Sequence, residues 1–455
     1  MQLTRYKLGE ILNVTRGASL SGEFYATEGE YIRLTCGNFD YQNNCFKENK
    51  SKDNLYYVGD FRSEFLMEEG DIITPLTEQA IGLLGSTAII PESGKYIQSQ
   101  DVAKIVCKED LLDKNFAFYL ISSTLVKQQL SAAAQQTKIR HTSPDKIKDC
   151  TVWIPELSEQ KRIGKLLRSI DSKIELNRQI NQNLEAMAKQ LYDYWFVQFD
   201  FPNEEGKPYK SSGGNMVWNE KLKRNIPIGW NNGTLIDIAN ITMGQSPDGT
   251  SYNEIGEGVL FYQGSTDFGM RFPSVRQYTT APSRFAKKGD ILMSVRAPVG
   301  AVNIANNDCC IGRGLSALNS KIGSTTHLYY ILNDLRIAFD QRNAAGTTFG
   351  SITKEDLYNL PIVIPAKEVI SAFDKICSPM FDRQMLLGEE IDTLIKQRDE
   401  LLPLLLNGQV LVNSDLSVYK KRRGKIPSLT LNHVSDIQIL QCKCIIGIKT
   451  VHYTL

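Results

Sequence analysis

One segment of the chain has the residue types of a metal-dependent nuclease. Pro144-Asp145 is followed by Glu159 and, two positions later, by Lys161. Metal-assisted phosphodiester cleavage needs carboxylates that converge on Mg²⁺, here with a lysine nearby. In a nuclease the Glu–Lys pair should lie on a strand, but here it begins a predicted long helix, directly after Ser158, a favoured N-cap type. A nuclease therefore remains only an alternative.

Other catalytic signatures do not occur in the sequence. There is no GxxxxGK[ST] phosphate loop, no GxGxxG run that opens a helix and no Asn-Pro-Pro-aromatic run. The nearest imitation of the last, NLPI at 359–362, lies on a predicted strand. No two of the four histidines share a helix face. We therefore predict no catalytic residue and no metal ligand in this chain.

Polar loops combine basic residues with amides and hydroxyls, a mixture suited to DNA. Arg and Gln can bind guanine and adenine edges through paired hydrogen bonds, whereas Lys, Ser and Thr more often hold phosphates. The formal net charge is +1, so this argument depends on local patches. The predicted DNA-binding residues are Arg16, Lys138, Arg140, His141, Gln245, Ser246, Arg271, Arg296, Arg313 and Thr347. Any single one of them is more often a solvated surface residue, and a scaffold protein without DNA binding stays open as an alternative. As a set, however, these residues favour DNA.

The elements that must position these residues occur twice along the chain. LGEILNVTRG at 8–17 resembles LIDIANITMG at 235–244. TKIRHTSPDKIKDCTVWIP at 137–155 aligns without gaps on TTFGSITKEDLYNLPIVIP at 347–365. Such self-similarity indicates repeated structural units. Within each unit, short apolar runs alternate with Gly and Pro, and helices come late, which predicts an α+β fold.

A long helix follows each unit, and the first carries a stripe at steps of four and three residues. The stripe is Ile163, Leu167, Ile170, Ile174, Asn177, Asn181, Leu184, Ala188, Leu191 and Trp195. This spacing is typical of a coiled coil, in which a buried asparagine fixes register. A short helix of this kind would pack on its own core, whereas one of this length needs a second long helix.

The second helix supplies a similar stripe, with a slip near Glu390 and a kink or restart expected at Pro379. Its members are Phe373, Ile376, Met380, Leu387, Ile391, Leu394, Leu401 and Leu405. We predict that the two helices pair as an antiparallel coiled coil. The aromatic end of the first helix would cap this seam and serve in docking. The predicted docking residues are Leu191, Tyr194, Trp195, Phe196, Leu401 and Leu405.

The composition is that of a globular protein, with 42% hydrophobic and 23% charged residues. No apolar run is long enough to cross a membrane, and the first residues lack the apolar core of a signal peptide. The nine cysteines are scattered, which favours free thiols in a reducing compartment. We expect a cytoplasmic protein that does not associate with membranes.

Three segments together resemble the specificity subunits of type I restriction–modification systems. They are EQKRIGKLLRSIDSKIELNRQINQNLEAMAKQLYDYWFVQFDFP, GNMVWNEKLKRNIPIGW and QRDELLPLLLNGQV, and the GQSPDGTSYN loop is similar as well. The resemblance covers about residues 3–412, in the family's order. Residues 413–455 match nothing expected after LLNGQV.

The resemblance implies a non-catalytic subunit that reads a split DNA target. It implies target-recognition domains at 1–156 and 230–365, conserved coiled-coil helices at 157–200 and 366–412, a linker at 201–229 and an atypical tail at 413–455. The implied partners are double-stranded DNA, two methyltransferase subunits, and restriction subunits that translocate and cut DNA. S-adenosylmethionine, ATP and Mg²⁺ would belong to those partner subunits, with no cofactor in this chain.

Overall fold

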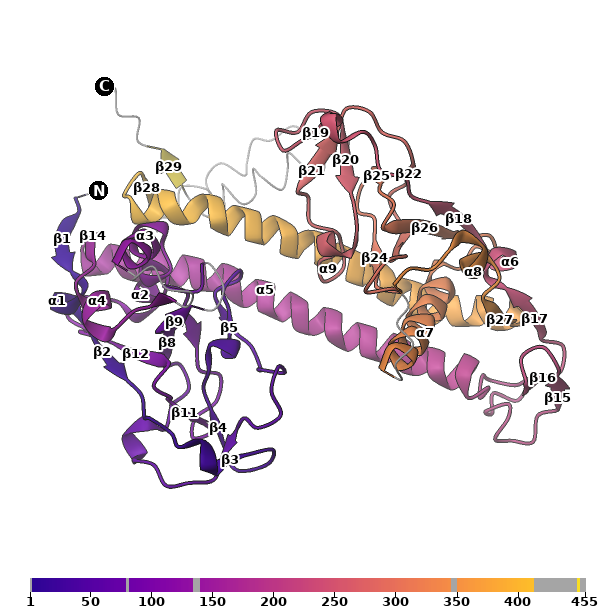
Figure 1. Cartoon of the computed structure of the whole chain (residues 1–455), viewed down its shortest axis with the longest axis horizontal. Helices are drawn as coiled ribbons and strands as arrows, with labels where there is room; N and C mark the ends of the chain where they lie inside the picture. The colour runs from indigo at the N-terminus through magenta and orange to yellow at the C-terminus, as the bar shows by residue number, and fades with distance from the viewer. Residues whose placement is uncertain (1, 79–81, 134–139, 345–349, 413–447, 451–455) are drawn as a thin grey trace, which may run out of the picture. The chain divides into compact units, whose positions relative to one another are not determined.

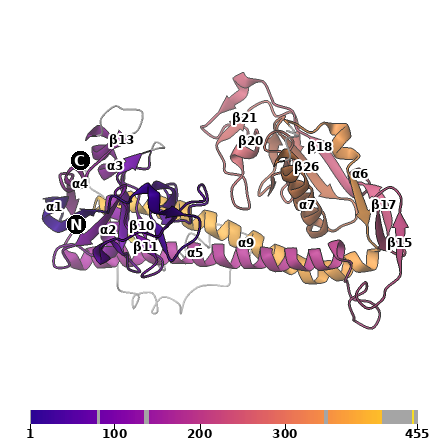
Figure 2. The same cartoon turned by 60° about the horizontal axis from the view of Figure 1, so that its bottom comes forward.

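A computed structural model describes residues 2–78, 82–133, 140–344, 350–412 and 448–450. The chain divides into two compact units (Figure 1, Figure 2). The first unit consists of residues 1–173 and 394–455, and the second of residues 174–393. Both long helices, α5 (Leu157–Tyr192) and α9 (Lys367–Leu406), contribute a segment to each unit.

The first unit is built on a four-stranded sheet with the order β10-β8-β12-β2. These strands are β2 (Leu12–Arg16), β8 (Ile72–Pro75), β10 (Ala88–Ile89) and β12 (Val102–Cys107). A second sheet, β11-β4-β7-β3, contains β3 (Tyr25–Ala26), β4 (Tyr31–Arg33), β7 (Tyr56–Tyr57) and β11 (Tyr96–Ile97). The other elements are β1 (Thr4–Lys7), β5 (Phe39–Asp40), β6 (Cys45–Phe46), β9 (Thr77–Glu78), β13 (Arg140–His141), β14 (Thr151–Ile154), β28 (Val410–Val412), β29 (Ile448–Thr450), α1 (Leu8–Ile11), α2 (Lys114–Ile121), α3 (Thr124–Ala133) and α4 (Pro144–Lys148).

The second unit has a four-stranded sheet with the order β18-β26-β23-β24. These strands are β18 (Ala239–Met243), β23 (Ile291–Ser294), β24 (Val302–Ile304) and β26 (Leu315–Ser320). A second sheet, β19-β21-β20-β25-β22, contains β19 (Tyr252–Asn253), β20 (Val259–Tyr262), β21 (Gln277–Thr279), β22 (Phe285–Ala286) and β25 (Cys309–Ile311). The other elements are β15 (Met216–Asn219), β16 (Arg224–Pro227), β17 (Asn231–Thr234), β27 (Pro361–Ile364), α6 (Leu235–Ile238), α7 (Thr325–Ala344) and α8 (Lys354–Tyr358).

The strand orders of the two units correspond, so the sequence repeat is also a repeat of topology. In chain order, β2, β8, β10 and β12 take the places that β18, β23, β24 and β26 take in the second unit. The glycine that closes each repeated segment has the same physical role. A Cβ on Gly17 would lie 2.2 Å from the carbonyl oxygen of Gln98, and one on Gly244 would lie 2.1 Å from that of Gly312. Only glycine permits this close approach of two backbones.

The predicted stripe of α5 is buried at most of its positions. Ile163, Leu167, Ile174, Asn177, Asn181 and Ala188 are each less than 5% exposed. The stripe of α9 differs from our prediction, because Ile376 is 43% exposed and Cys377 takes the buried place. Together with the partly buried Met380, Leu394 and Leu401, the buried positions of α9 keep steps of three and four without the expected slip near Glu390. They include the polar side chains of Gln384 and Arg398.

Two local expectations about the long helices, a restart of α9 at Pro379 and an N-cap at Ser158, were wrong. Residue 379 is proline, yet α9 is helical from Lys367 to Leu406 without a restart. The exposed position of Pro379 directs its ring toward solvent rather than into the packed face. At the start of α5, Ser158 is already inside the helix, which begins at Leu157, and its hydroxyl donates to the carboxylate of Glu156. Ser158 is therefore not the N-cap.

Each unit has its own apolar core that includes its helix segments. In the first unit Ile163 and Leu167 of α5 and Leu405 of α9 belong to the core of the main sheet. In the second unit Tyr192 and Phe373 belong to the corresponding core. Across the described ranges, no helix has the length and apolar character required to cross a bilayer.

Candidate nucleic-acid interface

One edge of the second unit gathers exposed basic side chains where several strands begin or end. Arg313 follows β25, Arg296 follows β23 and Arg284 precedes β22, and all three side chains are exposed. Gln245 and Ser246 follow β18. We call these five residues the basic edge; it contains four of the predicted DNA-binding residues.

Hydrogen bonds hold the members of the basic edge together. The Gln245 N–H donates to the carbonyl of Ile311 (3.0 Å), and the Ile311 N–H donates to the carbonyl of Arg284 (2.9 Å). The Arg313 N–H donates to the hydroxyl of Ser246 (3.3 Å). Residues from three distant parts of the sequence are therefore fixed beside one another.

The turn that carries Arg313 is held against β20 by a glycine on each side. A Cβ on Gly312 would lie 3.1 Å from the Cα of Gln263, and one on Gly314 would lie 2.5 Å from its carbonyl oxygen. The carbonyl of Gly314 also accepts a hydrogen bond from Val295 (2.9 Å), the residue before Arg296. The backbone thus fixes the positions from which the side chains of Arg296 and Arg313 extend into solvent.

The charge of the basic edge is not neutralised inside the part of the chain that the structure describes. No ion pair of Arg284, Arg296 or Arg313 occurs there. By contrast, Arg276 is paired with Asp267, and Lys288 lies 2.9 Å from Glu389. Unpaired, exposed guanidinium groups are available to bind phosphates or guanine edges.

The first unit has a similar edge, with a different balance of charge. Arg16 ends β2 and is exposed, and its Nε donates to the carbonyl of Gln100 (2.9 Å). Arg140 is partly exposed, and its Nη1 lies 3.6 Å from the carboxylate of Glu78, whose side chain is only 3% exposed. His141 is exposed. Lys138, like Thr347 of the second unit, lies outside the described residues.

One backbone pairing occurs at the same position in the edges of both units. His141 pairs with Thr77 across β13 and β9, and Ser351 forms a bridge with Arg296. The ungapped alignment of the repeats also places His141 opposite Ser351. Because the backbone pairing is the same, one scaffold position carries Thr77 in the first unit and Arg296 in the second.

Arg271 does not lie on the surface as we predicted. Its side chain is 7% exposed and lies 3.1 Å from Glu185 of α5 and 3.2 Å from Gln384 of α9. A guanidinium with these partners cannot reach DNA without unfolding its surroundings. The assignment of Arg271 as a DNA contact was therefore wrong.

Two predicted docking aromatics at the end of α5 are also buried. Trp195 and Phe196 lie in a π-helical turn, Asp193–Val197, and are 4% and 6% exposed. Both rings contact Phe373 of α9, at centroid distances of 5.9 and 5.0 Å. They stabilise the unit's own core, so a partner cannot bind them directly, and the same holds for Leu405, which is fully buried. Tyr194 is 37% exposed, and Leu191 and Leu401 are partly buried.

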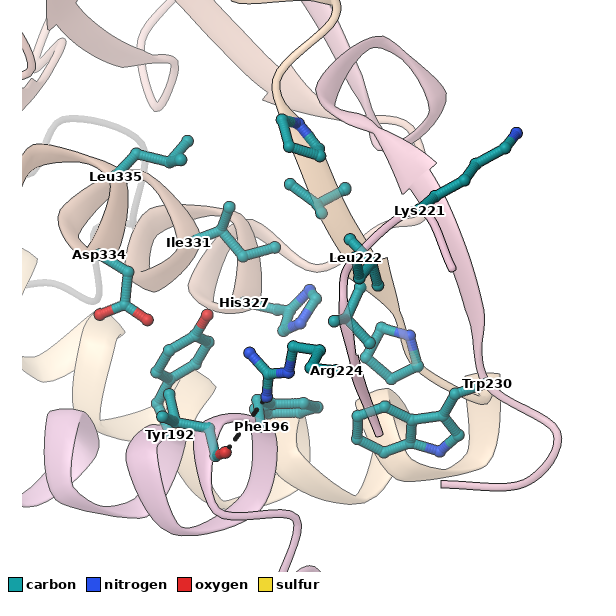
Figure 3. Close-up of a pocket in the computed structure, with 15 residues that line it drawn as sticks. Tyr192, Phe196, Lys221, Leu222, Arg224, Trp230, His327, Ile331, Asp334 and Leu335 are labelled. Carbon is teal, nitrogen blue, oxygen red and sulfur yellow. Dashed lines mark hydrogen bonds between the residues drawn. The ribbon is translucent and has the colours of Figure 1, made fainter. Parts of the chain in front are cut away.

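A cavity of about 350 Å³ lies beside this aromatic cluster (Figure 3). Tyr192 and Phe196 of the helix end and Trp230 line it, with Arg224 and His327 nearby. The carboxyl group of Asp334 completes one side. Burial lowers the pKa of His327 to about 4, so its imidazole is neutral near pH 7. Burial also disfavours the charged form of the Asp334 carboxyl group and so raises its pKa, whereas the nearby Lys189 ammonium lowers it.

Comparisons with known proteins agree with the geometry. The model of the type I restriction modification DNA specificity domain family matches residues 3–186 and 227–376. The chain belongs to this family. A candidate specificity subunit of the MjaX type I restriction enzyme from Methanocaldococcus jannaschii is 29% identical over 379 residues, which cover 79% of this chain and 84% of that one. The HindI specificity subunit of Haemophilus influenzae is 23% identical over 383 residues, with 70% and 81% covered.

A solved structure supports the fold. The S subunit of a type I restriction–modification system from M. genitalium matches with a TM-score of 0.57 at 16% identity, covering 89% of this chain and 96% of that one. Members of this specificity family recognise DNA and are not themselves enzymes.

The nuclease alternative has no support for this specificity-family chain. Asp145 lies in the short helix α4, and Glu159 lies in the first turn of α5, where it pairs with Arg162. Neither residue lies on a strand. Across the described part of the chain, no group of three or more His, Cys, Asp or Glu side chains could hold a metal ion.

Sequence reasoning missed two features of the edges. Ser351 could have been found, because the alignment of the repeats places it opposite His141. The pairing of Arg140 with Glu78 had no signal, since the two residues meet only through the register of β13 on β9.

Proposed function

We propose that this chain is the DNA-reading subunit of a type I restriction–modification system and catalyses no reaction itself. Membership of the specificity family supports this proposal. The observation that carries it is the basic edge, where three exposed arginines without acidic partners in the described residues are held by a fixed backbone. The corresponding edge of the first unit would read the other half of a bipartite target.

The chemistry of each edge suits base recognition. An arginine fork donates two parallel hydrogen bonds to O6 and N7 of guanine, and a glutamine matches adenine. Arg296, Arg313 and Gln245 supply these groups in the second unit. In the first unit Arg16 and His141 are exposed, while the ion pair of Arg140 with Glu78 restrains its guanidinium.

We propose further that α5 and α9 form an antiparallel coiled coil that sets the distance between the half-sites. In the first unit, Arg398 of α9 donates to Asp171 of α5 (3.0 Å). In the second unit, Asn177 donates to Glu390 (2.9 Å). From the first contact to the second, the residue number rises along α5 (171 to 177) and falls along α9 (398 to 390), which supports an antiparallel arrangement of the two helices. An insertion of four residues after Asn181, with a matching insertion in α9, should change the number of unread base pairs.

The partners would be double-stranded DNA, two methyltransferase subunits and restriction subunits, with S-adenosylmethionine, ATP and Mg²⁺ bound by those subunits. The proposed site of action is the cytoplasm, where seven described cysteines would remain as free thiols. Because Trp195 and Phe196 are buried, we propose other docking residues. Leu176, Met187 and Leu386 are 50%, 54% and 57% exposed on the long helices.

The docking proposal has a direct test. Met187→Asp and Leu386→Asp should each reduce co-purification with the methyltransferase subunit while leaving the melting temperature unchanged, because both side chains are exposed. Ile255→Asp makes the same change at a loop residue that is 79% exposed and is the matched control. Normal assembly by both helix variants would contradict the assignment.

The DNA proposal is tested on the complex with the methyltransferase subunit. Methylome sequencing of cells with and without this gene identifies the target, and fluorescence anisotropy on that duplex measures affinity. If Arg313 or Arg296 contacts guanine, its change to alanine should cost about 1–3 kcal/mol and relax one base of the second half-site. Lys207→Ala removes one charge from an exposed side chain in the linker and should have little effect.

The outcomes separate DNA reading from a scaffold without DNA binding. A DNA reader binds one split sequence above background, with an affinity that falls steeply with salt. A complex that assembles normally and shows no salt-dependent binding to any duplex would refute the proposal and favour the scaffold.

A further inference from the structure

The loop between β20 and β21 anchors the two sheets of the second unit, β18-β26-β23-β24 and β19-β21-β20-β25-β22, to the helix segments of that unit; we call these two the recognition sheets. Phe272 lies in this loop and is 6% exposed, and a Cβ on Gly388 of α9 would lie 2.5 Å from its ring. Glycine at 388 therefore lets the phenyl ring rest directly on the helix. This contact is separate from the peptide connections that join the sheets to α5 and α9.

Arg271, the residue before it, is the centre of a buried polar cluster. Its Nη1 donates to Glu185 (3.1 Å) and to the hydroxyl of Tyr329 (3.3 Å), and its Nη2 donates to Gln384 (3.2 Å). Gln384 in turn donates to Glu185 (2.9 Å). One guanidinium thus joins a loop of the recognition sheets to α5, α7 and α9.

Two aromatic rings enclose the same guanidinium. Its central carbon lies 4.9 Å from the ring centroid of Tyr329 and 4.5 Å from that of Phe381. A planar guanidinium can stack on rings and donate several hydrogen bonds in its plane at the same time, which a lysine ammonium cannot. The site is therefore specific for arginine.

The anchor connects through a short path of hydrogen bonds to the basic edge. The carbonyl of Arg271 accepts from Ile304 (3.1 Å) of β24, the neighbour of β23, and β23 leads to Arg296. At the other end of the loop, the carbonyl of Tyr262 accepts from Gly312 (2.8 Å), the residue before Arg313. A rotation of the loop on the helices would carry both arginines with it.

We propose that Arg271 is a positioning residue that fixes the direction of the basic edge relative to the helices, and so restricts which distance between half-sites is accepted. This inference rests on the proposed DNA-reading function. Arg271 itself touches no base. Without its guanidinium, the sheets would keep their own strand pairing but could turn on α5 and α9, and duplexes with a changed spacer would then bind.

The test uses the full chain with its methyltransferase subunit and duplexes that keep both half-sites. The spacer between them has its natural length or is one base pair shorter or longer. For Arg271→Lys and Arg271→Met, we expect the preference for the natural spacer to fall by about tenfold, within the range of coupling between contacting residues. The preferred bases of each half-site should not change.

A stability-matched control separates positioning from general destabilisation. Leu357→Ala removes a fully buried side chain of α8 and leaves the arginine cluster intact. It should lower the melting temperature and retain the spacer preference. Equal spacer preference in wild type and both Arg271 variants would overturn the proposal, as would equal relaxation in Leu357→Ala.

The same experiment distinguishes a failure of the proposed DNA-reading function from a failure of the positioning role. If the wild-type complex binds no duplex specifically, DNA reading itself is wrong. If it binds specifically and the Arg271 variants change the preferred bases of the second half-site, Arg271 acts in base recognition and the positioning role is refuted.

Discussion

Replacement of Asp171 should test whether a buried ion pair holds the helix segments of the first unit together. Asp171 of α5 and Arg398 of α9 are 19% and 9% exposed at their side chains and lie 3.0 Å apart. The hydroxyl of Tyr119 donates to the same carboxylate. Asp171→Ala therefore removes the partner of a buried cation and of a buried phenol.

The magnitude follows from this geometry. Removal of one partner from a buried ion pair costs about 3–5 kcal/mol, because the other charge stays buried without compensation. Arg398 retains Asp399 at 2.9 Å. We therefore expect Asp171→Ala to lower the free energy of unfolding by about 2–3 kcal/mol, below the full range. The double variant Asp171→Leu, Arg398→Met should lose less than Asp171→Ala, because no buried charge is left unpaired and only the Tyr119 hydroxyl lacks its acceptor.

Urea unfolding followed by circular dichroism measures these changes. Asp145→Ala removes a carboxylate that is 93% exposed and should leave the midpoint unchanged. The reasoning is refuted if Asp171→Ala unfolds at the wild-type urea concentration, or if the double variant is less stable than the single one.

Other predictions concern the aromatic end of α5, His327 and the tail. Trp195→Ala should lower stability by about 3–5 kcal/mol, because it empties a buried aromatic site, whereas Tyr194→Ala should have a much smaller effect in the same thermal melt; equal effects would contradict the assigned burial. Burial in the folded protein lowers the pKa of His327 from 6.5 to about 4. As the pH falls, the unfolded chain therefore binds the proton before the folded protein does. The contribution of His327 to the free energy of unfolding should be complete above pH 6.5 and be lost between pH 6.5 and about 4. His327→Phe, which copies Phe116 at the third position of α2, should flatten this part of the curve of unfolding free energy against pH; an unchanged slope would show that other groups cause it. Truncation after Asn413 removes β29 from β28 but leaves Val410 in the core of the first unit, so the shortened chain should keep its methyltransferase partner and its target, as co-purification and methylome sequencing would show.

Parts of this structure with a local cause could be predicted from the sequence. Gly17 and Gly244 close repeated segments because a neighbouring carbonyl leaves no room for a Cβ, and the repeat led to the same strand order in both units. The stripe of α5 follows from its period alone. The basic edge was found in part, because Gln245, Ser246, Arg296 and Arg313 lie in loops with turn signals.

Features that depend on distant partners could not be predicted. Arg271 lies in a polar loop, and only Glu185 and Gln384, 86 and 113 positions away, make it a buried residue. The stripe of α9 was misread for a related reason. Gln384 and Arg398 are polar, so a search for apolar residues passed over them and gave an apparent slip.

The shared scaffold of the two units has a consequence for the genome that the protein reads. At one matching backbone position Thr77 is buried in the first unit, whereas Arg296 is exposed in the second. The two units therefore offer different side chains to DNA, and the two halves of the proposed target would differ in sequence. Such a target is not its own reverse complement. Every occurrence of the proposed target on a chromosome would therefore point in one of two directions, and the upper and lower strands would present different base sequences to the complex at the same locus.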